Sequence, residues 1–209
     1  MLPRSMHRPL LIASAATVIP FALYLFAVGT WASSAALALA LFAVVAYSAP
    51  PLRFKEVPLL DSVTSPAHFT LPAVVGALIG GAFIGGYLGL ALAAFFLWGM
   101  ASHALGAVQD VQSDRAGGLR SVATELGARL TTRSASTLYL AAAALCFALP
   151  SPGWAVGLLG LGYVANTVRF WNVTDATSAV VNRAWRVFLW LNYLTGAAVT
   201  FAVLASVAR

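Results

Sequence analysis

The chain has 209 residues, of which 61% are hydrophobic and only 9% are charged. An ordinary soluble domain carries about 25% charged residues, so this composition excludes a soluble globular protein and indicates a membrane protein. The formal net charge of +6 does not indicate nucleic-acid binding, because the basic residues are not interleaved with stacking aromatic residues on a hydrophilic surface. The single cysteine, Cys146, excludes a disulfide within the chain and a cysteine metal cluster.

Seven apolar runs, each near the roughly 20 residues that cross a bilayer, follow one another along the chain. They cover residues 10–28, 31–47, 63–84, 87–108, 134–149, 154–170 and 185–207. The first run follows basic residues, as in a signal peptide, but no small-residue cleavage site leads into a soluble domain, so we interpret it as a retained span. The pattern predicts an all-α transmembrane bundle of seven spans that forms a single domain over residues 1–209.

The charged residues indicate how this bundle lies in the membrane. If the seven spans alternate in direction, eleven of the twelve Lys and Arg residues fall in connections on one side, and only Arg209 falls on the other. The positive-inside rule then predicts a multi-pass protein of the cell membrane whose charged loops are cytoplasmic. Because no span carries a central Asp, Glu, Lys or Arg, a transporter or proton pump is disfavoured, and we expect the chemistry at the cytoplasmic mouth.

The fourth run ends in a segment that can bind a metal. Asp110 and Asp114 are four residues apart, so on a continuing helix their carboxylates share one side. Mg2+ commonly uses one or two carboxylates together with phosphate oxygens of a substrate, and it would relieve the repulsion between the two acids. His103 and Gly106 lie deeper on the same stripe, where Gly106 leaves room for a ligand. Two aspartates at this spacing are also common on solvated helix ends, and a lone membrane histidine more often packs than reacts.

A second charged loop follows the second run. Residues 47–55 read Tyr-Ser-Ala-Pro-Pro-Leu-Arg-Phe-Lys, and the paired prolines predict a stiff, extended connection. Arg53 and Lys55 are cations suited to phosphate, although they can also serve only as topology anchors. Asp61 or Ser62 can simply cap the third span.

Together the two loops resemble the UbiA superfamily of intramembrane prenyltransferases. The resemblance rests on residues 47–55 and, two spans later, on Asp-x-x-x-Asp-Arg at 110–115, a glycine pair at 117–118 and Ser-x-Ala-Thr-x-Leu-Gly at 121–127. Residues 59–62 (Leu-Leu-Asp-Ser) and 66–69 (Pro-Ala-His-Phe) look most similar to the lycopene elongase branch, whose members add prenyl units to a carotenoid.

The resemblance, together with the positions of His103, Gly106 and His68 in their apolar runs, singles out ten residues. Asp110 and Asp114 would be the catalytic residues and the ligands of the Mg2+ cofactor. Cations that would bind the substrate diphosphate are Arg53, Lys55, Arg115 and Arg120. Residues that would line the pocket are Tyr47, His103, Gly106 and His68.

Family members have nine spans and a first aspartate-rich motif after the second span. This chain shows no such motif, so its seven spans would correspond to the third to ninth, with Met1 an internal start or a fragment boundary. We therefore expect an N-terminally incomplete prenyltransferase domain that is inactive, or nearly so, in isolation.

The resulting hypothesis is Mg2+-dependent transfer of a prenyl group from an isoprenyl diphosphate to a lipophilic acceptor in the membrane lipid. A carotenoid such as lycopene is the leading acceptor. A quinone precursor, a chlorophyllide or a glycerol-phosphate lipid are alternative acceptors for the same chemistry. The alternative of another class is a truncated membrane protein without catalytic activity.

Overall fold

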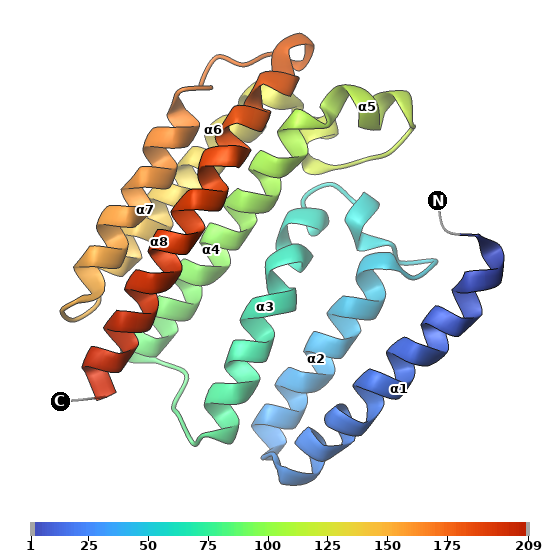
Figure 1. Ribbon diagram of the computed structural model, residues 1–209, viewed down its shortest axis with the longest axis vertical. Coiled ribbons are helices and arrows are strands. Elements are labelled where there is room, and N and C mark those ends of the chain that lie inside the picture. The colour runs from blue at the N-terminus through green and yellow to red at the C-terminus, as the bar shows by residue number, and fades with distance from the viewer. Residues whose placement is uncertain (1–2, 208–209) are drawn as a thin grey trace.

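The computed structural model describes residues 3–207, and all regular structure in this range is helical (Figure 1). The seven long helices are α1 Arg4–Val28, α2 Trp31–Ser48, α3 Leu60–Ile79, α4 Gly86–Gln109, α6 Val122–Phe147, α7 Gly153–Val168 and α8 Asn182–Val207. Three short elements lie between them, namely η1 Phe54–Glu56, α5 Val111–Ala116 and η2 Asp175–Val181. The predicted all-α class is confirmed.

Five of the long helices, α1 to α4 and α8, are long and apolar enough to cross a membrane. Helix α7 has 16 residues and rises about 24 Å, less than the roughly 30 Å of a hydrocarbon core. Helix α6 is longer, but its first three turns carry Glu125, Arg129 and Arg133. The structure is that of a multi-pass helical protein, while the count of seven spans remains a prediction.

The long helices run alternately up and down, so their connections gather at two ends (Figure 1). The connections that contain η1, α5 and η2 lie at one end, which we call the charged end. The opposite connections, around residues 29, 80–85 and 149–152, carry no charged side chain. This arrangement places the charged loops of the described residues together, as the alternating spans predicted. Arg209 and Met1 lie outside the described residues.

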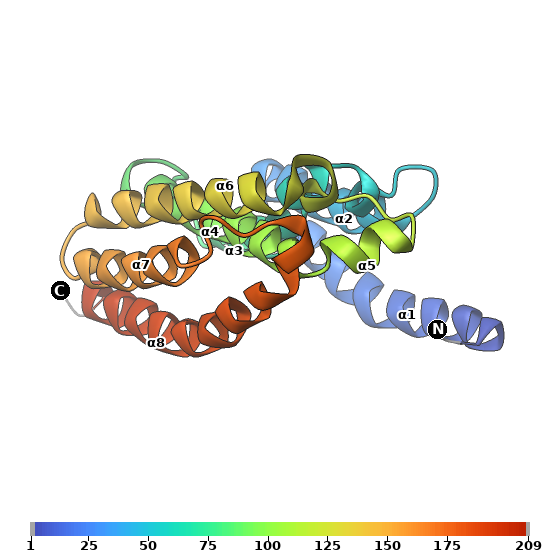
Figure 2. The ribbon, with the colours of Figure 1, turned by 90° about the horizontal axis from the view of Figure 1, so that it is seen from above.

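Helix α4 is the centre of the bundle. It packs against α3 and α6, α6 packs against α7, and α7 against α8. Seen from above, α6 lies on one side of α4 and α8 on the other, with α1 at the margin (Figure 2). Large buried side chains between α4, α6 and α7 are Leu105, Tyr139 and Tyr163. No residue in the most hydrophobic 18-residue window of α1 is buried inside the structure. The apolar surface of α1 is thus suited to contact with lipid.

Glycine permits the close approach of α3 to α4. A Cβ atom built on Gly99 would lie 2.4 Å from the Phe69 ring and 2.6 Å from the Cβ of Pro66. No real side chain fits there, and small residues at such crossings are how membrane helices pack closely. The contact holds the N-terminal half of α3 beside the C-terminal half of α4, which is where the candidate site forms.

Candidate functional site

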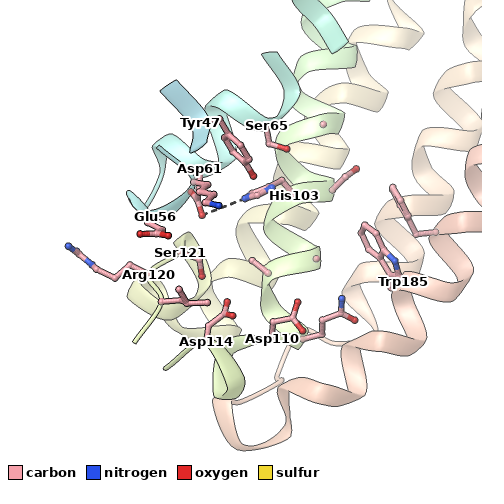
Figure 3. A pocket seen from close by; sticks show the side chains of 18 of the residues that line it. Tyr47, Glu56, Asp61, Ser65, His103, Asp110, Asp114, Arg120, Ser121 and Trp185 are labelled. Atoms are coloured by element: carbon pink, nitrogen blue, oxygen red, sulfur yellow. Dashed lines mark ion pairs between the residues drawn. The ribbon is translucent and has the colours of Figure 1, made fainter. Parts of the chain in front are cut away.

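A cavity of about 860 Å³ opens at the charged end. Helix α4 supplies its central wall, the α2–α3 side lies on one flank, and Trp185 of α8 lies on the other (Figure 3). Charged side chains around its mouth are Arg53, Lys55, Glu56, Asp110, Asp114 and Arg120. Aromatic side chains line its deeper part, namely Phe69, Trp98, Trp185 and Phe188. One space thus joins a polar mouth to an apolar interior.

The cavity brings together eight of the ten residues that the sequence singled out. These are Tyr47, Arg53, Lys55, His103, Gly106, Asp110, Asp114 and Arg120. They come from three separate segments, the end of α2 with the η1 connection, the last turns of α4, and the α4–α6 connection. Arg115 and His68 are not among the lining residues.

The two aspartates lie where α4 gives way to α5. The helix does not continue unbroken, because Asp110 has φ −98° and ψ 0° and caps α4. The amide of Asp114 still donates to the carbonyl of Asp110 at 2.8 Å, so the two acids remain one turn apart. Burial and the negative charge of Asp110 raise the pKa of the Asp114 carboxyl above its ordinary value. The two carboxylates line one cavity one turn apart and are a suitable oxygen pair for a hard divalent cation.

Arg115 turns away from the cavity because Asp175 holds it. Its Nη1 lies 2.6 Å from Asp175 Oδ2, and its Nη2 donates to the carbonyl of Thr124 at 2.9 Å. The other oxygen of Asp175 accepts from the amide of Ala128 at 2.6 Å. Arg115 therefore orients the segment that carries Asp114, and the sequence, which offered no motif around Asp175, did not reveal this.

A glycine makes the contact to Asp175 possible. Gly127 interrupts α6 with φ 78°, a left-handed conformation that other residues adopt only at a cost. The interruption presents the Ala128 amide to Asp175, and a Cβ at Gly127 would lie 3.4 Å from the Asp175 Oδ1. The first turns of α6 are thus fixed against η2 beside the site.

Asp61 is a site residue that sequence reasoning treated as a helix cap and as part of the Leu-Leu-Asp-Ser resemblance at 59–62, without a role in the site. It is 0% exposed, at the start of α3, and it lines the cavity. Its Oδ1 accepts from the amide of Ser62 and its Oδ2 from the amide of Val122, both at 2.7 Å. His103 Nε2 lies 3.5 Å from the same Oδ2. The local signals were an acid at the edge of an apolar run and the family-like stretch 59–62, and neither reveals partners on α4 and α6.

The cations at the mouth differ in their partners. Arg53 pairs with Glu56, and Arg120 lies 3.3 Å from Glu125. Both arginines are about half exposed or more, so these pairs contribute little and can be exchanged for another anion. Lys55 lines the cavity and makes no ion pair within the described part of the chain. Its charge is thus available to a ligand.

Comparison with known proteins identifies the family. A family model described as the UbiA prenyltransferase family matches residues 5–193. The chain belongs to this family. It is 53% identical over 204 residues to a protein of Corynebacterium glutamicum named lycopene elongase/hydratase, with 98% of this chain and 71% of the relative covered.

Two more distant relatives agree with this assignment. The chain is 49% identical over 207 residues to the C(50) beta-cyclic carotenoids biosynthesis protein LbtBC of Dietzia sp., covering 99% of this chain and 48% of that protein. It is 34% identical over 173 residues to a lycopene elongase/hydratase of Haloarcula japonica, covering 78% and 56%. No solved structure matches the chain. The predicted resemblance, including its lycopene elongase branch, is confirmed, and the chain is a prenyltransferase.

His68 and Gly106, two of the predicted pocket residues, both contact or border aromatic side chains. His68 Nδ1 lies 2.7 Å from the carbonyl of Thr64, and its ring packs edge-on against Tyr47 with the centroids 4.9 Å apart. His68 thus supports a cavity residue of this prenyltransferase from behind. Gly106 lines the cavity, and a Cβ there would lie 3.4 Å from the Trp185 ring. The part of the cavity beside Gly106 is therefore bordered by the Trp185 ring of α8.

Proposed function

We propose that this chain transfers a prenyl group from an isoprenyl diphosphate to a carotenoid such as lycopene. The observation that carries the proposal is one cavity that is lined by Asp110, Asp114 and three cations at its mouth and by aromatic rings in its interior. A prenyl diphosphate has the same division, with a multiply charged head and a hydrocarbon tail. The carotenoid acceptor is inferred from the names of the relatives.

The donor atoms fit Mg2+. Asp110 and Asp114 would hold it, because carboxylate oxygens are its usual protein ligands and it is commonly bound through one or two of them plus substrate phosphate. Within residues 3–207 there is no group of three or more His, Cys, Asp or Glu side chains that could hold a metal. The diphosphate oxygens would therefore complete the coordination. When bound, Mg2+ neutralises the diphosphate and makes it a better leaving group.

The chain's own cationic and aromatic side chains bind the diphosphate and protect the carbocation. Lys55, Arg53 and Arg120 donate hydrogen bonds to the diphosphate oxygens and stabilise the charge that develops as the C–O bond breaks. The aromatic interior excludes water from the allylic carbocation and presents negative ring faces to it. A cavity of about 860 Å³ holds the prenyl group and one end of the acceptor, and the rest of a long polyene extends into the bilayer.

The test is a transfer assay in membranes that contain lycopene. The chain is expressed as it stands and, separately, with an added N-terminal segment that carries two apolar spans and an aspartate-rich motif. Each is incubated with isoprenyl diphosphate and Mg2+, and products are separated and weighed by mass spectrometry. From the extended chain we expect a carotenoid heavier by one prenyl unit that disappears in excess chelator, and from the chain as it stands we expect little or no product. Full conversion in chelator, or transfer only to a non-carotenoid acceptor, would overturn the metal or the acceptor assignment respectively.

A further inference from the structure

The cavity contains a histidine and a buried aspartate that the roles proposed above do not use. The Asp61 side chain is 1% exposed, and two backbone amides, from Ser62 and Val122, donate to its two oxygens at 2.7 Å. A buried carboxylate needs such donors, and these two also fix its orientation. The amide of Val122 belongs to the first turn of α6, so Asp61 is tied to an element 61 residues away.

His103 presents one nitrogen to this carboxylate. Its Nε2 lies 3.5 Å from Asp61 Oδ2, while its side chain is 22% exposed and lines the cavity. A carboxylate only accepts hydrogen bonds, so this contact favours the tautomer with the hydrogen on Nε2. Nδ1 has no hydrogen-bond partner among residues 3–207. In His68, by contrast, the helix carbonyl of Thr64 occupies Nδ1.

The position of His103 along α4 relates it to the reaction. It precedes Asp110 by seven residues, which is two turns or about 10 Å along the axis, and it follows Trp98 by little more than one turn. His103 therefore lies where the charged mouth meets the aromatic interior (Figure 3). That is the region in which the prenyl carbon and the acceptor would meet.

The proposed reaction leaves a proton to be removed. When the C–O bond of the donor breaks, its electron pair leaves with diphosphate, and the electron pair of an acceptor double bond then forms the new C–C bond. The acceptor becomes a carbocation. It is neutralised when a neighbouring C–H bond gives its electron pair to a new double bond and its proton to a base. If water adds instead, its oxygen bonds to the cation and the base takes the water proton.

We propose that Nδ1 of His103 is this base and that Asp61 is its positioning residue. The inference rests on the proposed function, because it concerns the step that follows prenyl transfer at the same site. Asp61 holds the ring with Nδ1 unprotonated and stabilises the imidazolium that forms. The same base serves both outcomes, proton loss and water addition, that the relatives' name elongase/hydratase covers.

The test compares His103→Gln with wild type in the transfer assay. Gln keeps an amide that can donate to Asp61 and removes the base. Three quantities are measured, namely diphosphate release, free prenyl alcohol and modified carotenoid. We expect modified carotenoid to fall by about 10²-fold or more while Mg2+-dependent release of diphosphate continues. An acceptor cation that cannot lose its proton breaks the new C–C bond again, and the prenyl cation that is returned adds water, loses a proton to the released diphosphate and accumulates as prenyl alcohol. His7→Gln, on the exposed surface of α1, is the matched control and should resemble wild type.

The outcomes separate this inference from the proposed function. Extended wild type that releases no diphosphate refutes the proposed function. A His103→Gln variant with the rate and product ratio of wild type shows that another base, such as the departing diphosphate, takes the proton, and overturns the inference.

A second measurement tests the inference even if the His103→Gln variant fails to fold. The ¹⁵N NMR shifts of His103 in the wild-type chain report its tautomer. We expect Nε2–H with Nδ1 unprotonated, and a mixture of tautomers in Asp61→Asn. A wild-type His103 that carries its hydrogen on Nδ1 would overturn the inference.

Discussion

The two ends of the bundle are built in different ways. At the charged end, side chains bond to backbone groups far away in the sequence, as Asp61 does with Val122 and Asp175 with Ala128. At the opposite end, the side-chain hydrogen bonds of the described residues join near neighbours, as Thr30 does with Ser33. The opposite end needs only to reverse the chain. The charged end must hold three connections in one geometry, and it is the end at which the cavity opens.

Asp61 and Asp175 show how acids hold that geometry. Both fix the N-terminal part of α6, Asp61 at its first turn and Asp175 just after the Gly127 interruption. They differ in burial, since the Asp61 side chain is 1% exposed and that of Asp175 is 39% exposed. The two should therefore differ in how much stability they contribute, and neither is interchangeable with Asp110 or Asp114, which lie one turn apart at the cavity mouth.

Removing a proposed metal ligand should have the largest effect on activity. We expect Asp110→Asn or Asp114→Asn to lower prenyl transfer by orders of magnitude, because the diphosphate loses its metal and hence its stabilisation as a leaving group. Initial rates at saturating Mg2+ measure this. Arg129→Gln, a charge change on an exposed part of α6, is the control. Retention of the wild-type rate by the double aspartate variant would refute the metal site.

Asp61→Ala should have the largest effect on stability. It leaves two backbone amides without an acceptor, one of them at the buried start of α6, and we expect a loss of about 3 kcal/mol. Thr30→Ala removes a helix cap at the opposite end and should cost about 1 kcal/mol. Denaturant unfolding in detergent, followed by circular dichroism, compares the two. Equal losses would mean that the charged end is no more tightly held than the other.

Asp175→Asn should affect activity more than stability. Asp175 is partly exposed, so its pair with Arg115 contributes about 1 kcal/mol or less. Without its charge, however, the segment that carries Asp114 loses the ion pair with η2 and keeps only the bonds of Arg115 to the Thr124 carbonyl and of Gln112 to the backbone carbonyl of residue 175. We expect transfer to fall between about tenfold and about 100-fold, as a small displacement of a catalytic group does. The measurement is the transfer rate beside the unfolding midpoint, and an unchanged rate would remove Asp175 from the positioning role.

The sequence predicted some parts of this molecule far better than others. The runs 31–47 and 87–108 match α2 and α4 within one residue at each end, because there the apolar stretch and the helix coincide. The run 134–149 misses the first twelve residues of α6, because those turns are polar and pack beside the mouth. Asp110 and Asp114 stood out through their spacing. The partners of Asp61 and Asp175 are backbone amides 61 and 47 residues away, and no local pattern reveals such contacts.

The smallest expected effect concerns the charge that Asp114 carries before any metal binds. Its pKa is raised in the folded chain, by burial and by Asp110, so the folded state holds this proton more tightly than the unfolded state does. The resulting stabilisation is complete below the unfolded pKa, about 4, and is lost as the pH rises through the folded pKa. At neutral pH without Mg2+, ionised Asp114 therefore weakens the fold slightly.

In chelator, Asp114→Asn should raise the thermal midpoint at pH 7 and leave it unchanged near pH 3. Added Mg2+ should reverse the order, because it stabilises only the chain that binds it. Glu125→Gln, an exposed acid outside the cavity lining, is the control for the change in net charge. If Asp114→Asn lowers the midpoint at pH 7 in chelator, the two carboxylates do not repel each other as their placement requires.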